Sequence, residues 1–219
     1  MKSVLLIGMG KFGQTIGQIL LSMGDDVTAV DRREEIINAI APRYSDAMIA
    51  NCTDINALST LDIPSFDACI VAIGDDFQSS LEISSLLKEL GAKHVVSRAT
   101  TEIQRKFLLR NGADEVIYPD RDIAEKLAVK LNASRVYDYV ELSNDYAVFE
   151  LAVPAEWAGR TLQEINPRRK YDINILTIKQ SDEEVFVPAA QYRFSEGDHM
   201  IVFGNIQKTL AFTNRGPRR

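Results

Sequence analysis

The chain has 219 residues, of which 46% are hydrophobic and 26% are charged, so it can bury a core in one large domain or two small ones. Its formal net charge of −6 argues against a nucleic-acid partner, because proteins that bind nucleic acids present a basic face. No apolar run approaches the roughly 20 residues that a membrane-spanning helix needs, and the first apolar run is too short for a signal peptide. We therefore expect a soluble, cytoplasmic protein that reaches a membrane only through a partner.

The two cysteines, Cys52 and Cys69, lie in apolar runs and lack the spacing of metal ligands. This pattern is typical of buried thiols in a reducing compartment. The basic end of the chain, NRGPRR, has no apolar pattern, and we interpret it as a frayed tail or a remnant of cloning.

The first part of the chain, roughly 130 residues, alternates between β-rich runs and helical patterns. Helical spacing of apolar residues, followed by glycine, predicts helices over 14–23, 77–90 and 101–110. Near-continuous apolar strands that alternate with helices predict a parallel sheet covered on both faces. The expected fold class is therefore α/β, a Rossmann-like, doubly wound parallel sheet. The predicted strands are 3–8, 26–31, 46–51, 68–74, 94–99 and 114–119.

A further helix is predicted over 120–132, where Ile123, Leu127 and Leu131 recur on one face and Asp120 or Asp122 is a plausible N-cap. From the pattern alone, this helix can either cross to a neighbour or pack on its own sheet. After it the chain changes to a small α+β module, so we place the domains at 1–133 and 134–215, with 120–132 as a crossover helix. The predicted elements of the module are strands at 136–143, 147–154, 174–179, 184–188 and 199–204 and helices at 161–169 and 206–212.

A glycine motif of the form G-x-G-x-x-G, made by Gly8, Gly10 and Gly13, lies between a predicted strand and a predicted helix. In such a loop the first glycine permits a tight turn, the second lets phosphates approach the backbone, and the third lets the helix pack on the strand. The helix N-terminus offers free N–H groups to phosphates. Asp31 ends the second strand 23 positions after Gly8, where a carboxylate accepts hydrogen bonds from ribose. This favours NAD or an adenosine nucleotide over NADP.

Arg32 and Arg33 follow Asp31, and an arginine here can stack on adenine, contact a 2′-phosphate or simply face solvent at a helix start. The loops after the other strands supply further candidates, because ligands bind outside the carboxyl ends of parallel strands. For each of these candidates a plain surface or capping role is an alternative. The predicted nucleotide-binding residues are Gly8, Gly10, Lys11, Phe12, Gly13, Asp31, Arg32, Asn51, Thr53, Ala72, Gly74 and Arg98.

Nothing in the sequence marks the acid or base that a dehydrogenase needs beside its cofactor. His94 and His199 both lie in predicted strands, where a structural role is expected, and no Tyr-x-x-x-Lys pair or H-E-x-x-H motif occurs. We therefore expect a nucleotide sensor that is not an enzyme. One alternative is a small NAD(H)-dependent oxidoreductase. Another, a redox-sensing regulator that acts on DNA, is disfavoured by the acidic charge.

Several segments in order resemble the RCK (regulator of K⁺ conductance) family, in particular the KtrA/TrkA-type cytosolic regulatory subunits of bacterial K⁺ uptake systems. These segments are VLLIGMGKFG, VTAVDRREE, MIANCTDINAL, IVAIGDDFQSSL, GADEVIYPDRD and YVELSNDYAVFEL. RTLQEINPRRKYDINILTIK and FSEGDHMIVFG resemble the family's C-terminal subdomain. The resemblance implies homodimers that assemble into a ring, commonly an octamer, under a membrane K⁺-translocating subunit of the KtrB/TrkH type. It also implies that ATP, ADP or NAD(H) at the glycine loop changes the ring and gates transport.

The resemblance also suggests roles for single residues. Lys11 matches a basic position that reaches the terminal phosphate of ATP across a subunit interface, where arginine is usual; lysine keeps the charge but loses the bidentate fork. Asp120 matches an acidic position, often glutamate, that can hold a divalent cation. Phe12, near that interface, is expected to pack rather than to contact ligand.

Some family members bind cyclic di-AMP at a dimer interface of the C-terminal subdomain. An ordinary hydrophobic dimer interface is the alternative. The matching residues here are Ile165, Arg168, Ile173, Ile175 and Pro188.

Overall fold

The computed structural model describes residues 1–133, 135–180 and 184–214. The chain forms two compact units, Met1–Arg121 and Asp122–Arg219. The division falls inside helix α6 (Pro119–Asn132), whereas the sequence analysis placed it at the end of that helix. Residues 215–219 of the basic tail, including the last residue of the expected second domain, lie outside the described residues.

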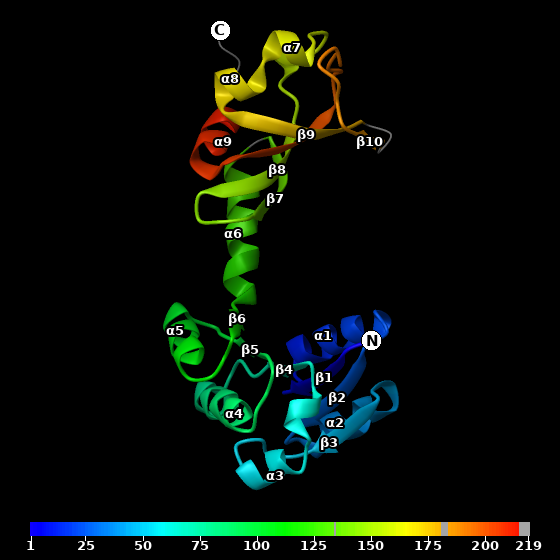
Figure 1. Cartoon of the computed structure of the whole chain (residues 1–219), viewed down its shortest axis with the longest axis vertical. Coiled ribbons are helices and arrows are strands. Elements are labelled where there is room, and N and C mark those ends of the chain that lie inside the picture. The colour runs from blue at the N-terminus through cyan, green and yellow to red at the C-terminus, as the bar shows by residue number, and fades with distance from the viewer. Residues whose placement is uncertain (134, 181–183, 215–219) are drawn as a thin grey trace. The chain divides into compact units, whose positions relative to one another are not determined.

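The first unit contains a parallel sheet of six strands in the order β3-β2-β1-β4-β5-β6 (Figure 1). Strand order reverses between β1 and β4, which is the topological switch point of a doubly wound fold. This confirms the predicted Rossmann-like fold class. Its strands are β1 (Ser3–Ile7), β2 (Asp26–Asp31), β3 (Asp46–Ile49), β4 (Ala68–Val71), β5 (Val95–Arg98) and β6 (Glu115–Ile117). Its helices before α6 are α1 (Lys11–Ser22), α2 (Glu34–Ile40), α3 (Ile55–Ser59), α4 (Phe77–Glu89) and α5 (Glu102–Arg110), with 3₁₀ turns at Ala41–Arg43 and Ile63–Ser65.

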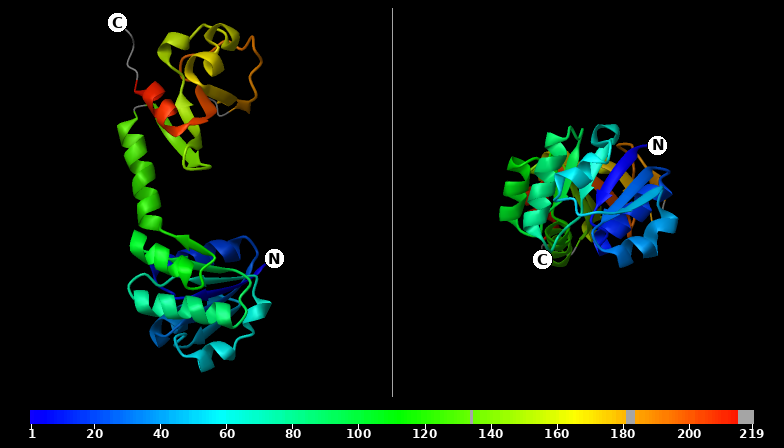
Figure 2. Two further views of the ribbon diagram at one scale, coloured as in Figure 1. Left: turned by 60° about the vertical axis from the view of Figure 1, so that its left-hand side comes forward. Right: turned by 90° about the horizontal axis from the view of Figure 1, so that it is seen from below.

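Successive residues of β1 feed two different cores, because side chains alternate between the faces of a strand. Val4 and Leu6 pack with residues of α1 and α2, while Leu5 and Ile7 pack with residues of α3 and α4. Figure 2 shows α4 and α5 side by side on one face of the sheet, where residues of both helices share a small apolar cluster. The sheet is therefore covered on both faces, and its strand ends are left to form loops.

The short helices α2 and α3 are missing from the sequence prediction. They contain seven and five residues, too few for apolar periodicity to identify a helix. The loop before α3 is nevertheless well specified, because the side chain of Asp54 accepts a hydrogen bond from the backbone N–H of Asn56.

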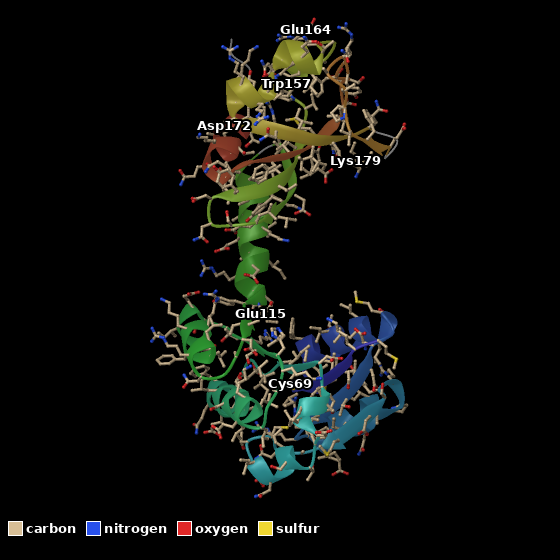
Figure 3. The ribbon with its side chains drawn as sticks, in the orientation of Figure 1. Cys69, Glu115, Trp157, Glu164, Asp172 and Lys179 are labelled. Carbon is tan, nitrogen blue, oxygen red and sulfur yellow. The ribbon has the colours of Figure 1, made fainter. Side chains whose placement is uncertain are left out.

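The second unit is an α+β module, as predicted, with an antiparallel sheet of five strands in the order β10-β9-β11-β8-β7. Trp157, labelled in Figure 3, is 1% exposed and lies at the centre of its core. Its ring packs against Tyr171, Phe194 and Phe212 at centroid distances of 5.6, 5.5 and 5.6 Å. Its elements after α6 are β7 (Val136–Glu141), β8 (Tyr146–Ala152), a 3₁₀ turn (Ala155–Trp157), α7 (Leu162–Ile165), α8 (Pro167–Tyr171), β9 (Ile173–Lys179), β10 (Val185–Phe186), β11 (His199–Asn205) and α9 (Ile206–Thr213).

The single helix predicted over 161–169 is wrong, because the structure breaks it into α7 and α8. Asn166, between them, has a left-handed φ of 50°. Pro167 causes the break, since a proline disfavours helical geometry in the residue before it, and asparagine tolerates the left-handed region. Residues of both short helices line a cavity in the second unit.

Residues at the end of α6 belong to the core of the second unit, which explains the position of the division. Ala133 is buried in that core, and Val129 packs against it. Within the described residues, no helix is long and apolar enough to cross a membrane.

Candidate nucleotide-binding site

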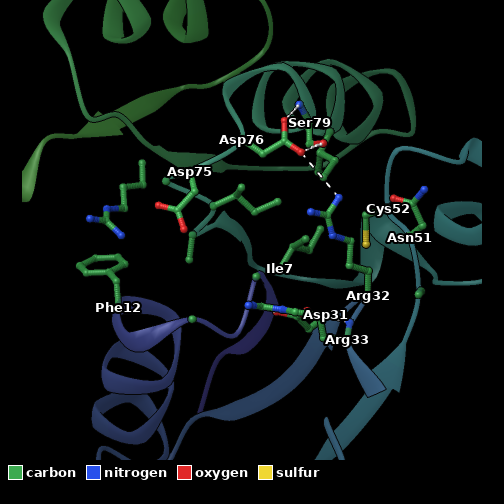
Figure 4. A pocket seen from close by; sticks show the side chains of 18 of the residues that line it. Ile7, Phe12, Asp31, Arg32, Arg33, Asn51, Cys52, Asp75, Asp76 and Ser79 are labelled. Carbon is green, nitrogen blue, oxygen red and sulfur yellow. Dashed lines mark hydrogen bonds and ion pairs between the residues drawn. The ribbon is translucent and has the colours of Figure 1, made fainter. Parts of the chain in front are cut away.

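A cavity of about 520 Å³ opens in the first unit where the strands of the sheet end (Figure 4). The glycine loop after β1 contributes Gly8, Gly10 and Lys11 to its wall, the turn after β2 contributes Arg32 and Arg33, and the loop after β4 contributes the segment from 72 to 76. The cavity thus lies at the switch point of the sheet, which is where doubly wound proteins bind ligands.

Packing explains two of the three motif glycines. Gly8 has a φ of +93°, and a Cβ on it would lie 2.8 Å from the Ile73 side chain. A Cβ on Gly13 would lie 2.0 Å from the carbonyl oxygen of Gly8, so only glycine lets α1 start so close to β1. Gly10 differs, because no atom of the described residues lies within 4 Å of where its Cβ would be. Its missing side chain leaves open space beside the cavity at the N-terminus of α1.

Asp31 is the buried charge of the site, with 5% of its surface exposed. Its Oδ2 accepts hydrogen bonds from the backbone N–H of Met9 at 2.8 Å and from Arg33 Nη2 at 2.8 Å. Its Oδ1 accepts from the backbone N–H and from Nε of Arg33, both at 2.9 Å. Burial by itself raises the pKa of Asp31, but the hydrogen bonds from Arg33 and Met9 outweigh it and hold that pKa below its ordinary value.

The neighbouring arginine, Arg32, points elsewhere. Its Nη1 lies 3.6 Å from Oδ2 of Asp76, an ion pair drawn as a dashed line in Figure 4. Asp76 also caps α4, since its side chain accepts a hydrogen bond from the backbone N–H of Ser79 at 3.1 Å. Hydrogen bonds from the Ser79 side chain and backbone lower the pKa of Asp76. The two arginines therefore neutralise two different carboxylates on the cavity wall.

Arg98, at the end of β5, packs over the glycine loop. Its guanidinium carbon lies 5.2 Å from the centroid of the Phe12 ring, a cation–π contact. Its Nη2 lies 3.6 Å from Oδ2 of Asp120, and its buried Nε has no hydrogen-bond partner among the described residues. A Cβ on Gly74 would lie 3.1 Å from Arg98 Nη1, so the absence of a side chain at Gly74 leaves room for the guanidinium. Phe12 thus packs against a cation of its own unit.

Most of the predicted residues come together in this cavity, whose described lining includes all of them except Gly13 and Thr53. Gly13 packs against the carbonyl oxygen of Gly8, and the Thr53 hydroxyl donates to Oδ1 of Asn51 at 3.0 Å. Asp120 is outside the lining and its side chain is 72% exposed. The sequence prediction missed several lining residues. Some of them lie in loops that follow predicted strands, and that position could have identified them. The missed residues are Ile7, Ala50, Cys52, Ile73, Asp75, Asp76, Ser79 and Ile83, while Arg33 was considered beside Arg32 but was not included in the predicted set.

The thiol of Cys52 takes part only as a packing group. Burial raises its pKa to about 12, and the nearby Asp31 carboxylate adds to the effect. A thiol with such a pKa is almost entirely protonated at neutral pH and is a poor nucleophile.

The residues around Asp120 do not form a divalent-cation site by themselves. Asp120 supplies one carboxylate, and its partner is the positively charged Arg98. Within the described residues there is no group of three or more His, Cys, Asp or Glu side chains that could hold a metal ion.

A second cavity, of about 390 Å³, lies in the second unit between α7, α8 and β9. Arg168, Ile173 and Ile175 are among its lining residues. Ile165 is buried in the core at 2% exposure, and neither it nor Pro188 belongs to the described lining. The structure thus brings together three of the five residues predicted here.

The parallel sheet, the glycine loop and the buried Asp31 define a Rossmann-like nucleotide-binding domain, followed by a small antiparallel module. Sequence models of the TrkA-N domain and the TrkA-C domain match residues 4–119 and 146–215. The chain belongs to this family of Trk and Ktr potassium uptake proteins, to which the sequence analysis assigned it.

Two relatives from Bacillus subtilis (strain 168) cover nearly the whole chain. The chain is 35% identical to Ktr system potassium uptake protein C over 98% of its length and 97% of that protein. It is also 35% identical to Ktr system potassium uptake protein A, with the same two coverages. Among solved structures, the GsuK channel bound to NAD has a similar fold, with a TM-score of 0.67 at 14% identity. That match covers 100% of this chain but only 40% of the channel chain.

Proposed function

We propose that this protein is a nucleotide-sensing regulatory subunit that gates a membrane potassium transporter. ATP or ADP, or NAD(H), binds in the cavity of the first unit and favours one conformation of the assembly over another. Only a nucleotide whose affinity differs between two conformations can shift their populations, so the proposal requires that the bound nucleotide bind one conformation more tightly than the other. Membership in the family of potassium uptake proteins supports the choice of transported ion.

The observation that carries the proposal is the wall of the first cavity. It combines the glycine loop, the start of α1 and the buried carboxylate of Asp31 at one end of the sheet. A helix N-terminus with free N–H groups favours phosphate, and a carboxylate at the end of β2 suits a ribose diol. The distance between these two groups in sequence is that of dinucleotide-binding folds, and the structure supports their use by one ligand.

Lys11 provides the sharpest test, since it is the exposed first residue of α1 and lines the cavity. We expect Lys11→Ala to weaken ATP binding about tenfold and ADP binding by no more than about threefold, because a charge-assisted contact to the terminal phosphate is lost. Isothermal titration calorimetry measures both affinities. Lys106→Ala removes an equal charge from the exposed surface of α5 and serves as the control. Equal losses of affinity for ATP and ADP in Lys11→Ala would contradict a contact between Lys11 and the terminal phosphate of ATP.

We also propose that the protein is not an enzyme. The relatives are named as potassium uptake proteins, and the first cavity has Asp31, Asp75 and Asp76 but no histidine among its described lining residues. Incubation of the purified protein with NADH and a panel of carbonyl compounds, followed at the NADH absorbance, tests this. Turnover above that of Asp31→Ala protein would instead favour a small oxidoreductase.

The partner in this proposal is a membrane K⁺-translocating subunit, through which the protein associates with the inner face of the cell membrane. Co-expression with such a subunit in a bacterium that lacks K⁺ uptake provides the test. Growth at low K⁺ should require both proteins and should fall when Lys11 is replaced by alanine. Growth that does not depend on the present protein would count against regulation of transport.

We further propose that the chain forms homodimers, which assemble into an octameric ring. Ile123, Leu127 and Leu131 on α6 are 66%, 55% and 79% exposed, and their spacing puts them on one face of the helix. Such an apolar stripe suits a second copy of the chain. Leu127→Glu should lower the mass measured by light scattering, whereas Lys126→Glu on another face should not. An unchanged mass for Leu127→Glu would exclude this stripe as the contact between two copies of the chain.

The second cavity is our proposed site for cyclic di-AMP, because it combines Arg168 with apolar walls from Ile173 and Ile175. Arg168→Ala should weaken binding of that dinucleotide at least about fivefold, as a charged contact is lost. Arg169→Ala is the matched control, since the adjacent Arg169 is exposed and outside the described lining. For Asp120 we propose only that it supplies one ligand to a divalent cation whose other ligands include phosphate oxygens of the bound nucleotide.

A further inference from the structure

The carboxylate of Asp31 has all of its hydrogen-bonding capacity in use. Two ionised oxygens offer about four acceptor positions. Oδ1 accepts from the backbone N–H and from Nε of Arg33. Oδ2 accepts from the backbone N–H of Met9 and from Arg33 Nη2. A ribose diol that bonds to Asp31 must therefore displace donors that are already there.

The four donors differ in how easily they can leave. The backbone N–H of Met9 is fixed within the glycine loop between β1 and α1, and the backbone N–H of Arg33 is fixed at the N-cap of α2. The guanidinium of Arg33 is on a long side chain that is 48% exposed, whereas the Asp31 side chain is 4% exposed. Rotation of the Arg33 side chain into solvent therefore frees one position on each oxygen while the backbone remains in place.

Those two positions suit the two hydroxyls of a ribose. The fork of an arginine places two parallel N–H groups against the two oxygens of a carboxylate. The 2′- and 3′-hydroxyls of a nucleotide donate to a carboxylate at the end of β2 in the same bidentate way. We infer that the guanidinium of Arg33 occupies the ribose subsite of the cavity and competes with the 2′,3′-diol of the nucleotide for Asp31. Arg33 is then a specificity-determining residue of the proposed nucleotide site.

Of the two adjacent arginines, Arg33 is the one that competes with the diol, because the Arg32 side chain pairs with Asp76 and not with Asp31. Arg32 is 65% exposed and turns toward Asp76 on the opposite wall (Figure 4). Arg33 and Asp31 lie together below it, beside the glycine loop. The sequence treats the two arginines alike, and only their side-chain partners distinguish them.

The test compares ATP with 2′,3′-dideoxy-ATP, which has no diol to bond to Asp31. Titration calorimetry gives the ratio of the two dissociation constants, dideoxy-ATP over ATP, for the wild type and for Arg33→Ala. We expect this ratio to rise about three- to tenfold in the variant, because ATP no longer displaces an exposed bidentate ion pair. The ratio cancels the loss of positive charge near the phosphates, which affects both ligands equally. Arg43→Ala, an exposed arginine outside the described lining, should leave the ratio unchanged.

Arg33→Lys keeps the charge beside Asp31 and guards against misfolding of the alanine variant. A single ammonium cannot engage both oxygens through a fork, so the ratio should rise by an intermediate amount. A ratio that stays unchanged or falls in both variants would overturn the competition and would make Arg33 a bystander or a ligand contact. The inference rests on the proposed function. If neither ATP, ADP nor NADH binds the wild type at all, the nucleotide site itself is refuted, which is a different result from nucleotide binding with an unchanged ratio.

Discussion

The two cavities are held in place by different kinds of structure. The first lies where parallel strands end, with a buried carboxylate and with glycines at Gly8 and Gly13 that leave no room for a side chain. The second lies between one strand, β9, and the helices α7 and α8, of four and five residues, and its arginine is exposed. A site fixed by backbone packing tolerates few substitutions and keeps its shape, whereas a site that is partly built on two short helices depends more on local interactions such as the cap of α7.

The largest expected effect is that of Gly13→Ala, which tests whether packing fixes the first cavity. Because the added methyl would lie 2.0 Å from the carbonyl oxygen of Gly8, we expect the free energy of unfolding to fall by about 3 kcal/mol, the upper end of the usual cost of overpacking. Chemical denaturation measures it. Gly10→Ala is the matched control, since its methyl meets open space.

In Gly10→Ala, stability should stay level or rise by about 0.5 kcal/mol, since alanine restricts the unfolded chain. Its nucleotide affinity should nevertheless fall at least about tenfold, because the methyl obstructs the approach of phosphates to the backbone. Equal stability of the two variants would show that the glycine loop is not fixed by packing.

Asp31→Asn should have the next largest effect, a loss of about 1–3 kcal/mol at pH 7, because hydrogen bonds to a charged group are lost. The pKa of Asp31 is lowered by folding. Its contribution to stability is therefore complete above the ordinary carboxyl pKa of about 3.9 and disappears as pH falls through the lower folded value. The stability difference between wild type and variant should shrink below about pH 4.

Denaturation at a series of pH values tests this dependence. Asp62→Asn, at an exposed carboxylate of the same unit, should cost little at any pH. A difference for Asp31→Asn that does not change between pH 7 and pH 3 would contradict the role of its charge.

The smallest effect concerns the second cavity. The Thr161 hydroxyl accepts from the backbone N–H of Glu164, whose carboxylate accepts from the backbone N–H of Thr161, and this capping box starts α7. Thr161→Ala should cost about 1 kcal/mol, while Thr161→Ser should cost little. Thermal denaturation measures both, and ATP binding in the first unit should not change. A serine variant as unstable as the alanine variant would show that the cap hydroxyl is unimportant.

The difference between the cavities also explains what the sequence could predict. Gly8, Gly10, Gly13 and Asp31 could be predicted because the spacing of a strand, a tight turn and a helix is fixed by backbone geometry. The partner of Asp31 could not, since Arg32 and Arg33 are adjacent and chemically equal, and only the turn into α2 decides which one reaches the carboxylate.

In the second unit, the sequence contains a signal for the break between α7 and α8. Pro167 marks a break after Asn166, yet apolar spacing suggested one continuous helix. Ile165 was expected at a dinucleotide site or a dimer interface, and it lies in the core of the second unit instead, at 2% exposure. Apolar residues of a cavity wall and of a core look alike in sequence. The pattern therefore could not separate Ile173 and Ile175, which line the cavity, from Ile165, which does not.

Trp157 gives the chain a built-in optical reporter. It is the only tryptophan among the 219 residues, and it is buried among aromatic rings in the second unit. Its emission therefore reports on the packing of that unit's core. A nucleotide that binds beside the glycine loop and alters this emission would show, without any label, that the signal has travelled from one unit to the other.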